Sequence, residues 1–386
     1  MYTRRLGVPD RSFFLFGPRA TGKTTWLRQR LPDAVWHNLL LDGELARLAR
    51  SPEHLLLEAA ALERGRWVVV DEVQKLPPLL DVVQEILSRP EISVRFALTG
   101  SSARKLRRGQ ANLLAGRAVT RRFFPLVAQE FGLDVPVDDV LRFGCLPTIR
   151  SVPGTSSRND LLQAYVDTYL AEEIRAEALV RNLLSFTRFL EVAATMNGQV
   201  TNVSSIARDA GVARPTVQGY FDVLVDTLLA TWLPALRARA RVKEVAHPKV
   251  FFFDTGVVRA LAGRLHEPLE SAERGTLLET YVLHELRAYL NDSGCGGELS
   301  YWRTPAGLEV DLVWTRGKRQ VAIEVKASER WRHEDARALD ELAHGPGRAR
   351  PIAIYLGRSP LKDGSVDVWP LGDFLRRLYA GELLGD

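Results

Sequence analysis

Hydrophobic runs alternate with amphipathic stretches from residue 10 to about residue 130 of the chain. The runs Ser12–Phe16, Trp67–Val70 and Val94–Leu98 are almost entirely apolar, which is typical of strands buried on both faces of a parallel sheet. Helix-like stretches separate these runs. The pattern therefore predicts an α/β domain with a parallel sheet at the start of the chain.

The pattern changes in the remaining two thirds. Residues 159–182 are charged and amphipathic without Gly or Pro, which predicts one long helix. Residues 185–233 predict several short helices with a tight turn at Gly211, and residues 234–254 predict strands and a crossover. From about residue 272, a helix followed by strands and further helices predicts a second α/β unit. The predicted linkers are 150–158 and 262–271.

Composition limits the function only weakly. The 386 residues include 52 basic and 47 acidic ones, for a formal net charge of +5, which permits nucleic-acid binding without indicating it. The two cysteines, Cys145 and Cys295, have no metal-ligand spacing, so a disulfide framework or a structural zinc site is not expected. No run approaches the roughly 18 apolar residues that span a bilayer, and Phe13–Phe16 is too short for a signal peptide. We expect a cytoplasmic protein without a membrane partner.

A phosphate-binding motif follows the first hydrophobic run. Residues 17–24 read G-x-x-x-x-G-K-T between a strand-like run and a helix-like one, which is the context that a P-loop requires. Backbone N–H groups of such a loop surround phosphate oxygens, and the positive end of the next helix faces them. We expect Lys23 to contact the β- and γ-phosphates of ATP and Thr24 to ligate Mg²⁺. The expected nucleotide contacts are Gly17, Pro18, Arg19, Ala20, Thr21, Gly22, Lys23, Thr24 and Thr25.

Two carboxylates end the second hydrophobic run. Asp71 and Glu72 follow its last valine directly, so a buried strand delivers both to the carboxyl edge of the sheet. Asp71 can hold Mg²⁺ through its waters, and Glu72 can polarise the water that attacks the γ-phosphate. The third run ends in Thr99-Gly-Ser101, for which a plain helix cap is one interpretation.

These motifs, in this order, resemble a prokaryotic family of AAA+ ATPases whose C-terminal domain has long been labelled as of unknown function. The likeness continues through Leu114–Arg117, Phe124–Leu126, Lys249–Gly256 and Glu309–Asp311. It implies a ring-forming ATPase fold, a homo-oligomer that is expected to be hexameric, and a third strand between the other two. That strand would place Thr99, or Ser101 as second choice, beside the γ-phosphate. Arg117 is the candidate for the arginine that such rings supply from a neighbouring subunit.

A basic segment surrounds Arg117 and contains no acidic residue between positions 104 and 122. Surface solvation or an internal ion pair is the alternative interpretation of Arg117, and the other basic side chains could equally face DNA phosphates. The basic residues are Arg104, Lys105, Arg107, Arg108, Arg117, Arg121 and Arg122.

Residues 204–228 predict a helix-turn-helix. Gly211 forms the turn after a short capped helix, and Pro215 suits the first turn of the second helix. Ala207 and Gly211 are small enough for a close helix crossing. Residues 236–243 then alternate apolar and basic positions, as the wing strand of a winged helix would, although such modules also dock proteins or form oligomers. The expected DNA contacts, mostly to phosphates, are Arg214, Thr216, Gln218, Arg237, Arg239, Arg241 and Lys243.

Two strand-like runs near the C-terminus, residues 309–314 and 321–326, carry charges at alternate positions. A symmetric hairpin about Gly317 and Lys318 would place these charges opposite one another. Close carboxylates in an apolar setting are costly unless a cation balances them. The four charged residues that would share one face are Glu309, Asp311, Glu324 and Lys326.

The order Asp, then Glu-x-Lys, resembles the PD-(D/E)xK nucleases and resolvases. The resemblance implies Mg²⁺ ligation by Asp311, Glu324 and an acid on the first helix, here Glu279, with Lys326 assisting the attacking water. Val310 stands where that motif has a proline. An inert domain with charge-paired strands is the alternative interpretation.

Together these patterns predict three parts: an AAA+ P-loop ATPase domain at 1–150, a helical linker with a winged helix-turn-helix at 151–250, and a restriction-endonuclease-like α/β domain at 251–386. The first hypothesis is an ATP-hydrolysing motor that translocates on, or branch-migrates, duplex or branched DNA. The second is an ATP-gated, metal-dependent endonuclease. The third is a nucleotide-switch scaffold that binds a protein partner. ATP and Mg²⁺ are the expected cofactors. Glu72, Lys23, Thr99 and Arg117 are the expected catalytic residues.

Overall fold

The computed structural model describes residues 2–101, 114, 116–133, 136–170, 182–236, 247–345 and 348–384. The chain divides into two compact units. The N-terminal unit consists of Arg4–Pro125 and Asp226–Leu229. The C-terminal unit consists of Met1–Thr3, Leu126–Val225 and Ala230–Asp386. None of the helices in the described ranges is long and apolar enough to cross a membrane.

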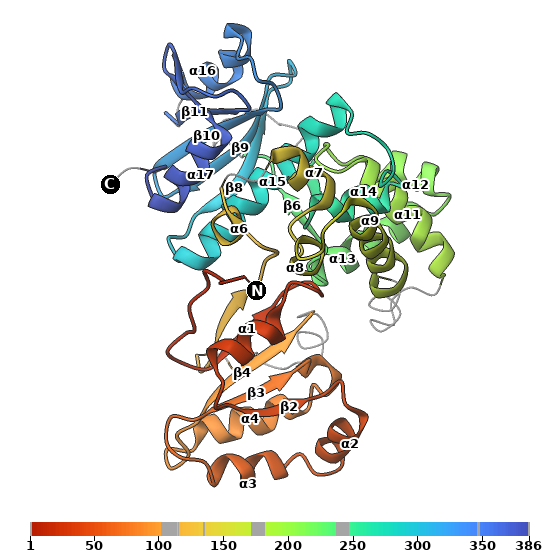
Figure 1. Ribbon diagram of the computed structural model, residues 1–386, viewed down its shortest axis with the longest axis vertical. Helices are drawn as coiled ribbons and strands as arrows, with labels where there is room; N and C mark the ends of the chain where they lie inside the picture. Colours follow the sequence, from red (N-terminus) through yellow and green to blue (C-terminus); the bar gives the residue numbers. More distant parts are fainter. Residues whose placement is uncertain are drawn as a thin grey trace. The chain divides into compact units, whose positions relative to one another are not determined.

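A five-stranded sheet forms the centre of the N-terminal unit (Figure 1), in the order β2-β3-β4-β1-β5. Each neighbouring pair runs parallel, so the predicted parallel α/β arrangement is confirmed. The strands are β1 (Phe13–Phe16), β2 (Val35–Asn38), β3 (Trp67–Asp71), β4 (Arg95–Gly100) and β5 (Val119–Arg122).

Both faces of this sheet are buried, which explains why its strands lack polar alternation. Phe14 and Phe16 point into a core with α2, α3 and α4, whereas Phe13 and Leu15 point into a second core with α1. Alternate residues of one strand thus serve two separate clusters. The helices are α1 (Lys23–Arg30), α2 (Asp42–Arg50), α3 (His54–Ala60) and α4 (Leu79–Ser88).

The first part of the C-terminal unit is mainly helical. Helix α9 begins at Thr155, earlier than the predicted start at residue 159, because Gly154 adopts a positive φ of 83° that turns the chain into the helix. It continues into a π-helical segment that ends at Leu170, and the rest of the predicted long helix lies outside the described residues. The elements are α6 (Ala128–Phe131), α7 (Val137–Phe143), α8 (Pro147–Arg150), α9 (Thr155–Ala164), η2 (Tyr165–Leu170), α11 (Leu183–Thr195), α12 (Val203–Ala210), α13 (Arg214–Asp226) and α14 (Thr255–Leu261).

Two sheets complete the C-terminal unit. A small antiparallel pair joins β6 (Ala230–Leu233) to β7 (Lys249–Phe252). A six-stranded sheet has the order β12-β13-β11-β10-β9-β8, and α15, α16 and α17 contact its strands. The remaining elements are α15 (Ser271–Ser293), β8 (Glu298–Arg303), β9 (Glu309–Arg316), β10 (Arg319–Lys326), η3 (His333–Ala336), α16 (Arg337–His344), β11 (Arg350–Tyr355), β12 (Leu361–Asp363), β13 (Val366–Pro370) and α17 (Leu371–Ala380).

The hairpin register between β9 and β10 is the predicted one. The strands run antiparallel from the pair Arg316–Arg319 to the pair Leu312–Ile323. The next residue along each strand is Asp311 on one and Glu324 on the other, so the two carboxylates face each other at the end of the ladder. Local alternation and the Gly317 turn were sufficient to specify this pairing.

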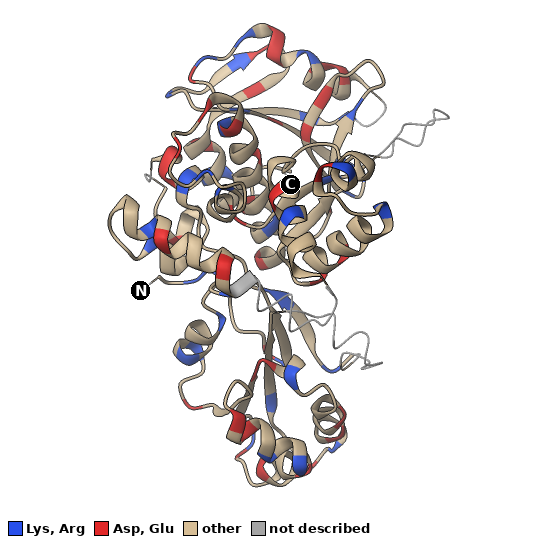
Figure 2. Ribbon diagram, turned by 90° about the vertical axis from the view of Figure 1, so that its right-hand side faces the viewer, with Lys and Arg blue, Asp and Glu red and all other residues tan. Residues whose placement is uncertain are grey.

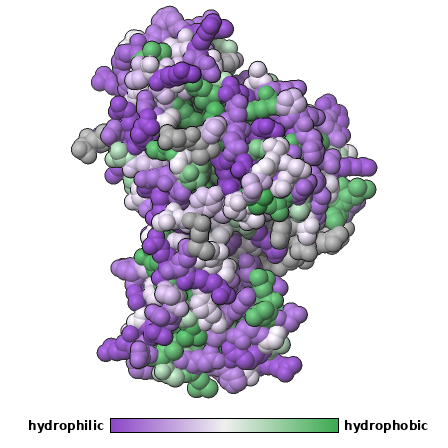
Figure 3. Space-filling view, viewed as in Figure 1, coloured by the Kyte–Doolittle hydropathy of each residue, from purple (hydrophilic) through white to green (hydrophobic). Residues whose placement is uncertain are grey.

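Charged residues are distributed over both units. Figure 2 shows basic and acidic positions interspersed along each of them. On the face drawn in Figure 3, hydrophobic residues form separate small patches among hydrophilic ones.

Candidate functional site

Three neighbouring strands bring the predicted nucleotide motifs together. Strand β4 lies between β3 and β1, with Leu98 beside Val70 and Gly100 beside Phe16. Because the three strands are parallel, the segments that follow them lie at the same edge of the sheet. The predicted position of the third strand is therefore confirmed.

The phosphate-binding loop is compact and leaves no room for larger residues at its start. A Cβ on Gly17 would lie 2.2 Å from the carbonyl oxygen of Phe123, and Gly22 has a φ of 91°. Lys23 is buried, and its Nζ donates to the carbonyl oxygens of Gly17 (2.6 Å) and Pro18 (3.0 Å). No side chain caps α1 at Gly22. The first amides of this helix are therefore suited to phosphate oxygens.

The two predicted Mg²⁺ ligands are already in contact. Thr24 Oγ1 donates to Asp71 Oδ2 at 2.9 Å. Thr99 is fully buried, and its hydroxyl donates to the other oxygen of Asp71. The same hydroxyl accepts the backbone N–H of Glu72 at 3.0 Å. Thr99 thus holds both carboxylate-bearing residues in place, a role that its predicted position at the strand end permits.

Glu72 is restrained by Gln74, a residue to which the sequence motifs give no role. The Gln74 side-chain amide donates to Glu72 Oε2 and to Ser101 Oγ. Glu72 itself has a φ of 61° and ψ of 48°, and a left-handed conformation at a non-glycine residue costs on the order of 1–3 kcal/mol. Gln74 is buried, and the structure shows no partner for its Oε1 among the described residues. The arrangement directs the Glu72 carboxylate rather than leaving it mobile.

Arg4 contacts the backbone of the phosphate-binding loop and of the segment that follows β5. Its guanidinium donates to the carbonyl oxygens of Thr21 (2.8 Å) and Phe124 (2.7 Å) and lies 4.1 Å from the ring centroid of Phe123. The sequence offers no signal for this contact, since an arginine near an N-terminus resembles any solvated charge. Its burial identifies it as part of the site's support.

Arg117 is exposed, and its backbone N–H donates to the Leu114 carbonyl at 2.8 Å. Arg121 and Arg122 belong to the edge strand β5. An exposed guanidinium is accessible to another molecule. The other basic residues of this predicted segment, Arg104, Lys105, Arg107 and Arg108, lie outside the described residues.

The helix-turn-helix segment has the expected two helices. Gly211 caps α12 with a φ of 68°, and the side chain of Asn202 caps its other end by accepting N–H groups of Ser204 and Ser205 (both 3.1 Å). Helix α13 buries Val217 and Tyr220. The predicted contacts Arg214, Thr216 and Gln218 are exposed on its first turns. Leu236 is described, but the predicted wing residues Arg237, Arg239, Arg241 and Lys243 lie outside the described residues.

The predicted nuclease-like residues of the C-terminal unit make contacts within the protein. No group of three or more His, Cys, Asp or Glu side chains in the described part of the chain is arranged to hold a metal ion. Asp311 Oδ2 instead accepts the backbone N–H of Val325 at 2.8 Å. Glu324 pairs with Lys326 at 2.7 Å. The metal-ligand roles of Glu279, Asp311 and Glu324 stay a prediction.

Lys249 lies in the same acidic cluster. Its Nζ lies 2.5 Å from Glu309 Oε1 and 3.8 Å from Glu279 Oε2, so an ammonium group occupies the acidic cluster. Burial and the nearby charge of Asp311 together raise the pKa of Glu324 to about 8, against the opposing effect of Lys326. Burial also raises the pKa of Asp311, and Lys249 opposes this shift. Side-chain charges within the protein balance these carboxylates.

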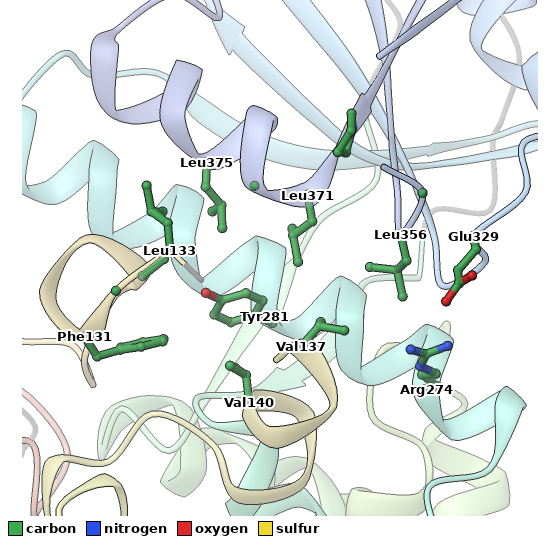
Figure 4. Close-up of a pocket in the computed structure, with 15 residues that line it drawn as sticks. Phe131, Leu133, Val137, Val140, Arg274, Tyr281, Glu329, Leu356, Leu371 and Leu375 are labelled. Carbon is green, nitrogen blue, oxygen red and sulfur yellow. The ribbon is translucent and has the colours of Figure 1, made fainter. Parts of the chain in front are cut away.

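A separate pocket of about 260 Å³ lies within the C-terminal unit. Figure 4 shows Tyr281, Leu371 and Leu375 around it, with Arg274 and Glu329 at one end. None of the predicted site residues lines this pocket. It therefore supports neither the nucleotide site nor the acidic cluster.

The residues of the N-terminal unit fit ATP with Mg²⁺. A threonine hydroxyl and an aspartate oxygen, which Thr24 and Asp71 present 2.9 Å apart, are the hard oxygen ligands that Mg²⁺ prefers. Lys23 lies inside the loop that would surround the phosphates, and Glu72 lies beside Asp71 on the same edge. Mg²⁺ would supply the divalent charge that neutralises the phosphate oxygens.

Three protein-family models match consecutive parts of the chain. Residues 9–132 match an AAA domain. Residues 136–267 match a domain of unknown function, DUF8612, and residues 274–374 match another, DUF4143. The chain therefore combines a region similar to AAA ATPases with a C-terminal DUF4143 region. These two regions agree with the family resemblance that the sequence motifs indicate. These matches do not identify a nuclease.

Relatives in other organisms extend over most of the chain. An uncharacterized protein of Mycobacterium tuberculosis is 27% identical over 377 residues, covering 96% of this chain and 82% of that protein. An uncharacterized protein of Methanocaldococcus jannaschii is 20% identical over 310 residues, covering 72% of this chain and 67% of that protein.

Two solved structures resemble the chain distantly. The Thermotoga maritima RuvB Holliday junction branch migration motor aligns with a TM-score of 0.30 and 12% identity, over 57% of this chain and 81% of that one. A signal transduction ATPase with numerous domains from Pyrococcus horikoshii aligns with a TM-score of 0.21 and 12% identity, over 75% of this chain and 46% of that one.

Proposed function

We propose that this chain is an AAA+ ATPase that couples ATP hydrolysis to the remodelling of DNA. The ATPase assignment rests on the hydrogen bonds that Thr24 and Thr99 donate to the Asp71 carboxylate. The bond from Thr24 Oγ1 to Asp71 Oδ2 is 2.9 Å long. Three segments distant in sequence converge on one carboxylate at the edge of a parallel sheet. A structural role alone would not require a glycine-rich loop, a buried lysine and two acids at this place.

Each residue has a distinct part in the proposed reaction. Lys23 binds phosphate oxygens, and Thr24 with Asp71 holds Mg²⁺. The Glu72 carboxylate accepts a hydrogen bond from the attacking water and orients it in line with the γ-phosphate. Gln74 fixes the direction of that carboxylate through its bond to Oε2. Arg117 of a neighbouring copy in a ring would stabilise the charge that develops on the transferring group.

The proposal that DNA is the partner rests on α13. Its first turns expose Arg214, Thr216 and Gln218, whereas Val217 and Tyr220 are buried. A helix that follows a tight glycine turn and exposes its N-terminal side chains can enter a major groove. The alternating basic residues from Arg237 to Lys243 would add phosphate contacts. The alternative, a protein-docking module, uses the same elements without phosphate contacts.

Measurement of ATP turnover with single-stranded, duplex and branched DNA tests this proposal. We expect stimulation by at least one DNA form. Replacing Arg237, Arg239 and Arg241 together should reduce the slope of log affinity against log salt by up to about 3, because each lost phosphate contact changes it by roughly 0.9. Replacing exposed Arg208 of α12, which pairs with Asp209 at 3.0 Å, is the control and should leave the slope unchanged.

The outcomes separate the hypotheses. Turnover that no DNA form changes, together with no salt-dependent DNA binding, would assign the helices to a protein partner. Labelled branched DNA that is remodelled in the presence of ATP supports the motor. Labelled DNA that is only cut, with loss of cutting in Asp311→Ala, would contradict it.

A further inference from the structure

Lys249 is the most deeply buried lysine of the C-terminal acidic cluster. Its exposed fraction is 3%, its Nζ contacts Glu309 and Glu279, and it lies 5.3 Å from the ring centroid of Tyr301. Lys326, the lysine that the sequence motif singles out, pairs with Glu324 and with Asp335 of η3 at 3.7 Å. The two lysines thus serve different carboxylates.

The backbone holds Lys249 in this position from two sides. It pairs with Leu233 across the β6–β7 ladder and forms an isolated bridge to Val200. The lysine therefore belongs to a regular strand whose neighbours on both sides are ordered, rather than to a loop that could withdraw it. Its side chain reaches Glu309 at the start of β9 and Glu279 within α15.

Electrostatics favours a charged lysine here. Its Nζ lies within ion-pair distance of two carboxylates, at 2.5 Å from Glu309 Oε1 and 3.8 Å from Glu279 Oε2. An ammonium in this place supplies the cation without which the buried carboxylates would be costly.

We propose that Lys249 is a built-in counter-cation that takes the place of a divalent metal in the acidic cluster, so that this cluster neither binds Mg²⁺ nor cleaves DNA. An ammonium cannot polarise a phosphoryl oxygen as a Lewis acid or generate a metal-bound hydroxide. A divalent ion placed among the same carboxylates would meet a positive charge that is already bonded to Glu309. The fold of an acid-rich hairpin is retained while its metal chemistry is lost.

The test is Mn²⁺ binding to the nucleotide-free full-length chain, followed by electron paramagnetic resonance of the free ion. Wild type and Asp311→Asn should give the same binding curve, because neither has a metal at the cluster. Lys249→Met should gain one Mn²⁺ site at least about tenfold tighter than any wild-type site and should melt at a higher temperature when Mn²⁺ is added. Lys249→Arg, which keeps the charge, should gain no site.

The double variant Lys249→Met/Asp311→Asn should lose the gained site, which locates it at the cluster. If wild type binds Mn²⁺ and Asp311→Asn does not, the lysine does not replace a metal and the proposal is wrong. A folded Lys249→Met that gains no site contradicts it equally. Should Lys249→Met not fold, the comparison of wild type with Asp311→Asn still decides. None of these measurements depends on ATP hydrolysis, so the proposed function can fail separately.

Discussion

The Thr24 hydroxyl in the phosphate-binding loop donates a hydrogen bond of 2.9 Å to the Asp71 carboxylate at the end of β3. The strand order β3-β4-β1 brings these residues together although they are distant in sequence. In the proposed reaction this contact would hold the two Mg²⁺ ligands in place, because each ligand oxygen is already bonded to the other. Thr99 holds the second oxygen of Asp71 and completes the support.

Thr24→Val should therefore raise the Mg²⁺ concentration needed for half-maximal ATP turnover by roughly tenfold, a loss of about 1.4 kcal/mol. The reason is that valine has similar shape but no ligand oxygen. Turnover measured across a Mg²⁺ titration checks this expectation. Thr24→Ser retains the hydroxyl and should stay close to wild type; an equal loss in both variants would point to packing instead of ligation.

Gln74→Ala should lower kcat roughly tenfold with little change in the KM for ATP. Loss of the amide frees the Glu72 carboxylate to rotate, which affects water orientation more than nucleotide binding. Steady-state kinetics distinguishes the two parameters. Gln84→Ala, on the exposed side of α4, is the matched control. A rise in KM without a change in kcat would remove Gln74 from the positioning role.

Arg117 should act across a subunit boundary. Arg117→Ala and Glu72→Gln should each be inactive alone, yet an equal mixture should recover roughly a quarter of wild-type turnover, because random assembly in a ring pairs an intact Arg117 with an intact Glu72 at that fraction of interfaces. Co-assembly is verified with two different affinity tags. No recovery at any mixing ratio, despite co-assembly, would leave the intersubunit role without support.

Glu285 should make the C-terminal unit less stable as pH rises. Burial raises its pKa from 4.5 to about 7, although Tyr379 and the Ala128 N–H donate to the carboxylate and oppose the shift. Between these two values the folded carboxyl retains a proton that the unfolded chain has released. The free energy of unfolding therefore falls with increasing pH through this window, by up to about 1.4 kcal/mol per pH unit.

Glu285→Gln removes that proton exchange. Its free energy of unfolding, measured by urea titration between pH 5 and 7, should fall less steeply than that of wild type. The exposed Glu298→Gln is the control and should keep the wild-type slope. Parallel curves for wild type and Glu285→Gln would show that Glu285 is ionised at both ends of the window.

The structural features that the sequence predicts are those encoded by residues adjacent in the chain. The G-x-x-x-x-G-K-T loop and the period of two in residues 309–326 are written in adjacent residues, so the P-loop and the hairpin register could be anticipated. Lys249 could not, because its approach to Glu309 depends on pairing between β7 and β6. Gln74 could not either, since its contact with Glu72 needs the left-handed backbone at that residue.

In the proposed function, Lys23 binds the nucleotide and Glu72 promotes its hydrolysis at one site. The measurement is ATP binding by a fluorescent analogue and phosphate release, made in parallel on wild type, Lys23→Ala and Glu72→Gln. We expect Lys23→Ala to lose binding, and Glu72→Gln to bind like wild type while turnover falls by about 10²–10⁴-fold, the usual contribution of a positioned general base. Equal phosphate release by wild type and Glu72→Gln, or unimpaired binding by Lys23→Ala, would contradict the account.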